Sequence, residues 1–153
     1  MTNCAERSIH RTRKAMRKSG RADEKQSSAN RSRRVLIVED ETILGFEVAV
    51  MVKSLGHSVV AMAGNEAEAV RLDARMKPDL VLMDVRLGRG PDGIDTAERI
   101  LQHRFIPIIF CTGYSSDQNT IERIRNLGPF QVLAKPFTIS ELKTALGRAE
   151  GMS

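Results

Sequence analysis

The sequence has few aromatic residues, few cysteines and no long apolar run, and each shortage excludes a class of protein. Aromatic residues make up 4% of the 153 residues and tryptophan is absent, so the core must be mainly aliphatic. The two cysteines, Cys4 and Cys111, cannot form a disulfide framework and fit a reducing, cytoplasmic setting. The longest apolar runs, such as residues 106–111, are too short to span a bilayer, and no signal peptide is visible.

Basic charge is concentrated at the start of the chain. Residues 1–34 hold 11 Lys and Arg against three acidic residues, a balance of +8, whereas residues 35–153 have a balance of −3. A segment so charged and so poor in apolar residues cannot bury enough surface to fold alone, so we expect residues 1–33 to be a disordered extension. Contact with nucleic acid, acidic lipid or an acidic partner is one interpretation of this extension. A solvated extension, or residues upstream of the true start, is the other.

From residue 34 onward, strand-like and helix-like segments alternate. Short aliphatic and β-branched runs predict buried strands over 35–38, 58–63, 80–83, 107–110 and 131–134. Apolar residues at helical spacing predict helices over 42–55, 65–75, 95–102, 117–127 and 138–149. Thr138 and Glu141 form a capping box at the start of the last helix. Five such βα units predict an α/β domain over residues 34–149, with one parallel sheet and helices on both faces.

Polar residues come directly after four of the five predicted strands, where a parallel sheet places its working residues. In chain order these are Glu39, Asp40 and Glu41, then Asp84, then Thr112, and finally Lys135 with Pro136. Carboxylates brought to one edge would repel one another, and clustered oxygen ligands of this kind suit Mg²⁺. A lysine and a hydroxyl beside them could bind the oxygens of a phosphoryl group.

Four motifs at these strand ends resemble those of the receiver domains of two-component response regulators. They are Val38-Glu39-Asp40-Glu41, Leu82-Met83-Asp84-Val85, Phe110-Cys111-Thr112-Gly113 and Lys135-Pro136-Phe137. Each motif alone is weak, but the four together, in order and at the ends of strands one, three, four and five, are specific. The resemblance spans residue 34 to about residue 149 and implies a flavodoxin-like (βα)5 fold.

The resemblance also implies a role for each of these residues. Asp84 would be the phosphoacceptor, and Glu39 and Asp40 the acidic pair that holds Mg²⁺, with Asp40 as a direct ligand. The main-chain carbonyl of Arg86 would complete the metal site. Thr112 would move to hydrogen-bond the phosphoryl group, Lys135 would pair with it, and the bond before Pro136 would be cis. A solvated helix N-terminus is the plainer interpretation of residues 39–41.

Two positions depart from the usual pattern of the family, and an aromatic residue stands at a third. Gly88 stands where many receivers have proline, and Val132 stands where many have the Tyr or Phe that moves after the threonine as a switch. Tyr114, two residues after Thr112, is therefore our candidate for the switch. The run Phe110-Cys111-Thr112-Gly113-Tyr114 resembles a subgroup marked by Phe-Ala-Thr-Gly and an aromatic, whose members are often single-domain regulators.

Two alternatives to phosphoryl acceptance stay open. A receiver-like module could bind partners without being phosphorylated, although the acceptor, the acidic pair, the threonine and the lysine are all present. An Asp-nucleophile phosphatase would need a second aspartate two residues after Asp84, and Arg86 occupies that position. His10, His57 and His103 share no metal-ligand spacing and are expected at the surface.

The predicted function is therefore that of a signalling domain rather than an enzyme, with at most intrinsic autophosphorylation and autodephosphorylation. A histidine kinase or a phosphotransfer protein would supply the phosphoryl group, and Mg²⁺ would be the cofactor. Residues 150–153 form a short tail with no effector domain expected after it, so output would pass through a partner protein. The sequence names neither the kinase nor the partner, and it leaves open a relay, a phosphate sink or a direct regulator, as well as the oligomeric state.

Overall fold

The computed structural model describes residues 31–113 and 117–152. The chain divides into two units, residues 1–31 and 32–153, and the second unit contains all the helices and strands of the described residues. The switch candidate Tyr114 and nearly all of the basic extension lie outside the described residues.

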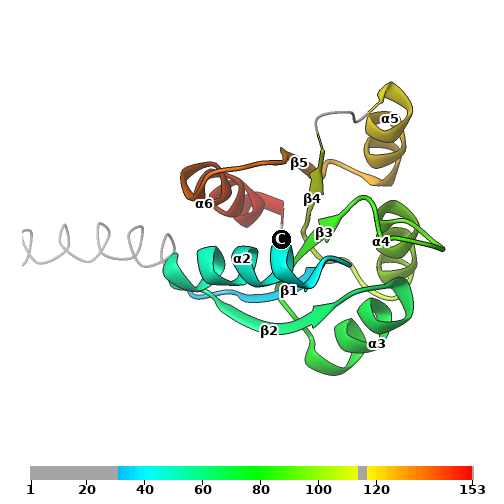
Figure 1. Ribbon diagram of the computed structural model, residues 1–153. Coiled ribbons are helices and arrows are strands. Elements are labelled where there is room, and N and C mark those ends of the chain that lie inside the picture. Colours follow the sequence, from blue (N-terminus) through cyan, green and yellow to red (C-terminus); the bar gives the residue numbers. More distant parts are fainter. Residues whose placement is uncertain (1–30, 114–116, 153) are drawn as a thin grey trace, which may run out of the picture. The chain divides into compact units, whose positions relative to one another are not determined.

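The centre of the fold is a parallel sheet of five strands in the order β2-β1-β3-β4-β5 (Figure 1). The strands are β1 (Arg34–Val38), β2 (Ser58–Ala63), β3 (Leu80–Asp84), β4 (Ile108–Thr112) and β5 (Gln131–Ala134). All five residues of β3 and of β4 are buried, which explains why both read as unbroken apolar runs that end in a polar residue. The predicted α/β fold with one parallel sheet is confirmed.

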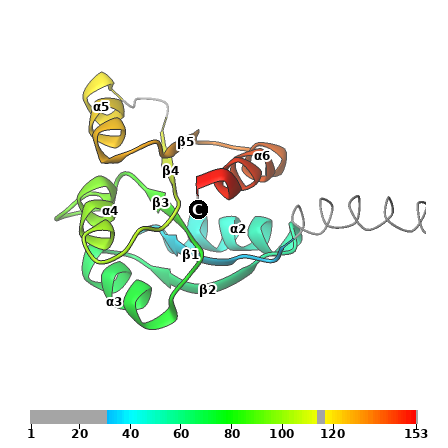
Figure 2. The ribbon, with the colours of Figure 1, turned by 180° about the vertical axis from the view of Figure 1, so that it is seen from behind.

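Helices cover both faces of this sheet, as Figures 1 and 2 show from opposite sides. The helices are α2 (Thr42–Ser54), α3 (Glu66–Met76), α4 (Gly93–Leu101), α5 (Gln118–Leu127), α6 (Ile139–Ala149) and the short 3-10 turn η1 (Glu150–Met152). One core lies between the sheet and α2 with α6, around residues such as Ile37, Leu82 and Leu142. The other lies between the sheet and α3, α4 and α5, around Met83, Ile94 and Phe110.

Side-chain caps begin four of these helices and explain where they start. Asn65, Asp92, Asp117 and Thr138 each accept hydrogen bonds from backbone amides of the next turn. The capping box of Thr138 and Glu141 is confirmed. Helix α4 begins two residues earlier than predicted, because Asp92 forms a second capping box with Asp95.

Helix α2 is unusual in that apolar side chains also cover its outer surface. Ala49 and Val52 face the core, while Ile43, Phe46 and Val50 are 75%, 60% and 67% exposed.

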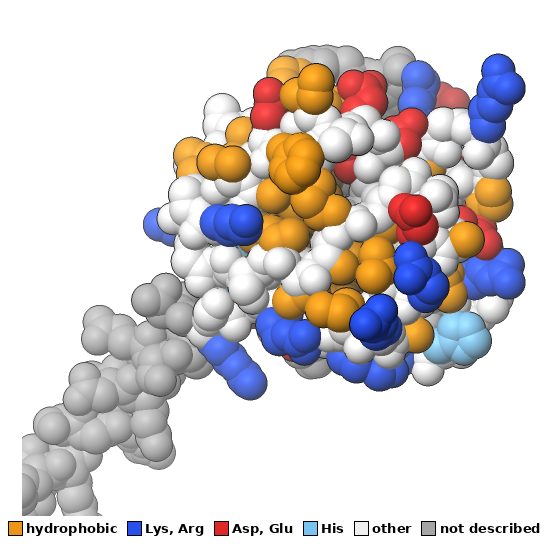
Figure 3. Space-filling view, turned by 60° about the horizontal axis from the view of Figure 1, so that its bottom comes forward, with side chains coloured by type: hydrophobic (Ala, Val, Ile, Leu, Met, Phe, Trp, Pro, Cys, Tyr) orange, Lys and Arg blue, Asp and Glu red, His pale blue; other side chains and the backbone are white. Residues whose placement is uncertain are grey.

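The surface of the molecule carries both apolar and basic groups. Figure 3 shows exposed apolar side chains in several patches, with Lys and Arg gathered mainly along the lower margin of the view. Within the described residues, no helix combines the length and apolar character needed to cross a membrane.

Candidate functional site

Three carboxylates meet at the carboxyl edge of the sheet. Glu39 and Asp40 come directly after β1, and Asp84 ends β3, the strand that pairs with β1. One oxygen of each carboxylate lies within 4.8 Å of the others. We call these three residues the acidic cluster. Glu39 and Asp84 are buried, whereas Asp40 is exposed to solvent.

Lys135 supplies positive charge to this cluster. Its Nζ lies 2.6 Å from Oε2 of Glu39 and 3.3 Å from Oδ2 of Asp84. Burial alone would lower the pKa of Lys135, but the hydrogen bond with Glu39 and the charge of Asp84 raise it above its ordinary value. Lys135 is therefore a fixed cation that touches two of the three carboxylates. The peptide bond between Lys135 and Pro136 is cis, as the resemblance implies.

Thr112 and Arg86 lie beside the cluster. Thr112 ends β4 and is buried, and its carbonyl accepts the backbone N–H of Lys135 at 2.6 Å. Its hydroxyl makes one long hydrogen bond, 3.4 Å, to the carbonyl of Gly113. Arg86 donates its backbone N–H to Oδ1 of Asp84 at 3.2 Å. The structure thus brings the predicted residues of strands one, three, four and five to one edge, while the roles assigned to them stay predictions.

Two glycines allow the backbone to approach this edge closely. Gly88 has φ +55°, which proline cannot adopt, and a Cβ there would lie 3.1 Å from Oδ2 of Asp40. A Cβ on Gly93 would lie 1.8 Å from the backbone carbonyl oxygen of Asp84. The sequence flagged Gly88 only as a departure from the family, and it did not single out Gly93.

Cys111 and His57 behave as structural residues. Burial raises the pKa of the Cys111 thiol to about 12, with a smaller opposing effect from Lys135, so the thiol stays protonated at neutral pH. This agrees with its interpretation as a small strand residue. His57 is half-buried rather than a plain surface residue, because its Nδ1 accepts the backbone N–H of Arg33 at 3.1 Å.

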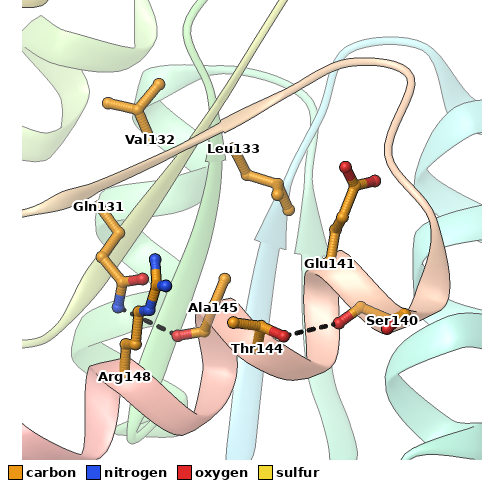
Figure 4. Close-up of a pocket in the computed structure, with 8 residues that line it drawn as sticks. All are labelled: Gln131, Val132, Leu133, Ser140, Glu141, Thr144, Ala145 and Arg148. Atoms are coloured by element: carbon orange, nitrogen blue, oxygen red, sulfur yellow. Dashed lines mark hydrogen bonds between the residues drawn. The ribbon is translucent and has the colours of Figure 1, made fainter.

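Two hollows flank the strand ends. One, of about 290 Å³, lies between α2 and the segment that follows β5, and is lined by apolar residues together with Glu47 of α2 and with Glu39 and Lys135 of the site. The other, of about 220 Å³, lies between β5 and α6 and holds none of the acidic cluster (Figure 4). Val132 lines the second hollow and is 41% exposed, so the position of the usual aromatic switch carries a small, solvent-facing side chain.

An ion-pair network next to the site was not predicted from the sequence. Arg123 of α5 contacts both Asp92 and Asp95 at the start of α4. Asp92 and Asp95 could be recognised as helix-start acids, but Arg123 sits on the polar side of an amphipathic helix, where arginine usually faces solvent. Nothing in the spacing of these residues indicates that they meet.

The acidic cluster suits a hard divalent cation. It offers carboxylate oxygens from three residues, and Lys135 compensates part of their negative charge. Mg²⁺ prefers such oxygen ligands and usually keeps several waters, so an exposed ligand such as Asp40 fits its coordination. The donor set therefore fits the ion that the sequence implies.

Comparisons with known proteins agree with this geometry. The family model described as the response regulator receiver domain matches residues 35–147. The transcriptional regulatory protein PdtaR of Mycobacterium tuberculosis is 44% identical over 114 residues, which cover 74% of this chain and 55% of PdtaR. The receiver domain of a modulated diguanylate cyclase from Desulfovibrio desulfuricans has a TM-score of 0.73 at 34% identity, covering 80% of this chain and 96% of that one.

A further solved structure is the anti-anti-sigma factor PhyR from Bartonella quintana. Its TM-score is 0.70 at 31% sequence identity, and the match covers 91% of this chain and 56% of that protein. The chain spans about half the length of the curated relatives that it matches.

Proposed function

Because the chain belongs to the family of response regulator receiver domains, we propose that Asp84 accepts a phosphoryl group from a phosphohistidine. The donor would be a histidine kinase or a phosphotransfer protein. A carboxylate oxygen of Asp84 forms the new P–O bond while the P–N bond of the phosphohistidine breaks and its electron pair returns to the imidazole. The observation that carries this proposal is the buried Asp84 carboxylate, held in an acidic cluster beside Lys135.

Each neighbouring residue has a task in this proposal. Glu39, Asp40, Asp84 and the carbonyl of Arg86 would hold Mg²⁺, which when bound would neutralise charge on the transferring phosphoryl group. Lys135 pairs with a phosphoryl oxygen, exchanging part of its contact with Asp84 for it. Thr112 has a weakly bonded hydroxyl that can turn toward the same oxygens.

The output of the domain is proposed to pass through a partner protein. PdtaR is described as a transcriptional regulatory protein and PhyR as an anti-anti-sigma factor, so relatives of this chain act in gene regulation. We place the phosphorylation function in residues 34–149 and treat the basic residues 1–33 as a separate extension. Such a domain works as a cytoplasmic signalling protein, with autophosphorylation and autodephosphorylation as its intrinsic chemistry.

The alternative is a binding module that is never phosphorylated. One experiment separates the two: the protein is incubated with acetyl phosphate and Mg²⁺, and its intact mass is measured. We expect the gain of one phosphoryl group in the wild type and in Glu47→Gln, an exposed acid of α2 outside the acidic cluster. We expect no gain in Asp84→Asn or after chelation of Mg²⁺. Phosphate on another residue, or none at all, would overturn the proposal.

A further inference from the structure

The guanidinium of Arg123 joins α5 to the first turn of α4. Its Nη1 lies 2.6 Å from Oδ2 of Asp92, and its Nη2 lies 3.2 Å from Oδ1 of Asp92 and 2.8 Å from Oδ1 of Asp95. Two parallel N–H···O bonds to one carboxylate form the bidentate geometry that fixes both direction and distance. We call these contacts the Arg123 clamp.

The clamped carboxylate is also the cap of α4. Oδ1 of Asp92 accepts the backbone N–H groups of Ile94 and Asp95, both at 2.9 Å. Burial alone would raise the pKa of Asp92, but the hydrogen bonds from Arg123 and from the backbone lower it below its ordinary value. Asp92 therefore stays ionised at neutral pH and holds the first turn of α4 to Arg123.

That first turn packs directly on the backbone of the phosphoacceptor. Gly93 donates its N–H to the carbonyl of Val85 at 2.9 Å. A Cβ on Gly93 would overlap the carbonyl oxygen of Asp84, so no space separates the helix start from the residue that reacts. A displacement of this turn toward the strand must therefore push on the backbone of Asp84, and a displacement away from it must break the hydrogen bond to Val85.

Helix α5 has little other attachment to the domain. All ten of its residues are described, and Ile124 is its one fully buried side chain, whereas α6 buries Leu142, Ala145, Leu146 and Ala149. Charged contacts therefore make up a larger share of the interactions that attach α5 to the domain than of those that attach α6. The main charged contact from α5 to the rest of the described domain is the Arg123 clamp.

We propose that Arg123 is a positioning residue for phosphoryl transfer, which acts through Asp92 and the first turn of α4 on the backbone of Asp84. This inference rests on the proposed function. The Arg123 clamp would then couple phosphoryl transfer at Asp84 to the position of α5. A movement of α5 carries Arg123 with it, and this changes the contacts of Arg123 with the first turn of α4. Coupling of this kind is reciprocal, so a partner that holds or moves α5 will change the rate at which Asp84 is phosphorylated.

The test is the rate constant for phosphorylation by acetyl phosphate and Mg²⁺, measured far below the thermal midpoint of every variant. Arg123→Gln should react about three- to tenfold more slowly, a change typical of residues that modulate coupling without contacting the ligand. Asp92→Asn should also react more slowly, because asparagine caps a helix as well as aspartate but offers the guanidinium one neutral oxygen in place of the charged bidentate carboxylate. Arg123→Lys should recover part of the rate, since lysine keeps the charge but not the bidentate contact.

Two further measurements separate positioning from general stability or charge. The double variant Arg123→Gln/Asp92→Asn should be no slower than Arg123→Gln alone, and the amide of Gly93 should exchange faster in all three variants. Arg125→Gln is the control, because Arg125 lies on the same helix and its side chain makes no hydrogen bond or ion pair within the described residues. It should react like the wild type.

Equal rates for wild type, Arg123→Gln and Asp92→Asn would overturn the inference and leave the proposed function standing. The same slowing in Arg125→Gln would also overturn it, because the effect would then be one of net charge. A wild type that takes up no phosphoryl group would overturn both the inference and the proposed function.

Discussion

The two edges of the sheet differ in how their buried carboxylates are balanced by positive charge. At the amino edge, buried Asp73 of α3 is matched by Arg104, whose Nε lies 3.2 Å from Oδ2 and whose Nη2 contacts Oδ1. At the carboxyl edge, three carboxylates lie together, and the ammonium of Lys135 contacts two of them, Glu39 and Asp84. A matched pair has its hydrogen bonds satisfied and leaves nothing for a ligand to complete. We therefore propose that the carboxyl edge, with its excess of negative charge, binds a cation, whereas the matched pair at the amino edge stabilises the fold.

Removing half of the matched pair should have the largest effect on stability. Arg104→Met leaves Asp73 buried without its partner, and Arg104 also donates to the carbonyl of Pro78. We expect a loss of about 3 kcal/mol in the free energy of unfolding, at the low end for a buried pair because Arg104 is partly exposed. Urea unfolding measures it. The control is Arg99→Gln, because Arg99 is an exposed partner of the half-buried Glu66, and less than about 1 kcal/mol should be lost.

If Arg104→Met proved no more destabilising than Arg99→Gln, the distinction between the two edges would fail, since the amino edge would then hold no indispensable pair.

The unmatched edge should instead be stabilised by a ligand. Mg²⁺ at ten times its dissociation constant should raise the free energy of unfolding by about 1.4 kcal/mol, because it binds the folded acidic cluster and not the unfolded chain. Asp40→Asn should lose most of this gain. Thermal unfolding in MgCl₂, compared with NaCl at equal ionic strength, makes the measurement. An equal gain in Asp40→Asn would place the cation elsewhere.

The smallest expected effect is a dependence of the free energy of unfolding on pH, caused by His57 at the amino edge. Burial, and then the charge of Arg33, lower the pKa of His57 below its ordinary value of 6.5. The folded state therefore disfavours the charged imidazole, so stability is complete above pH 6.5 and declines as the pH falls below it through the folded pKa. His57→Gln should flatten the stability profile between pH 7 and pH 5 in urea titrations. A profile unchanged by the substitution would show that other groups set the slope.

The fold and the strand ends could be predicted because buried parallel strands are unbroken apolar runs, and the polar residue that ends each run is visible in the sequence. Asp84 stands out for this reason, and so do Glu39 and Lys135. Contacts between helices carry no such signal. Arg123 and Asp92 are 31 residues apart, and Arg104 and Asp73 are also 31 residues apart. Each of these four residues alone is typical of a solvated surface.

Gly93 illustrates a second limit of the sequence. In the order Pro91-Asp92-Gly93 it is typical of a loop, and the predicted helix accordingly begins at Asp95. Glycine is required at this position because the carbonyl of Asp84, which belongs to another element, leaves no room for a side chain. A steric exclusion of this kind exists only once the helix has been placed against the strand.

The burial of Cys111 gives the protein an internal reporter. The thiol lies on β4 directly before Thr112, its pKa is about 12, and its side chain is enclosed. An alkylating reagent can reach it only in molecules in which β4 has come free of its neighbours β3 and β5. The labelling rate at this sulfur, measured separately from that of Cys4, therefore reports how often the strand next to Asp84 opens, with no dye or substitution introduced into the site.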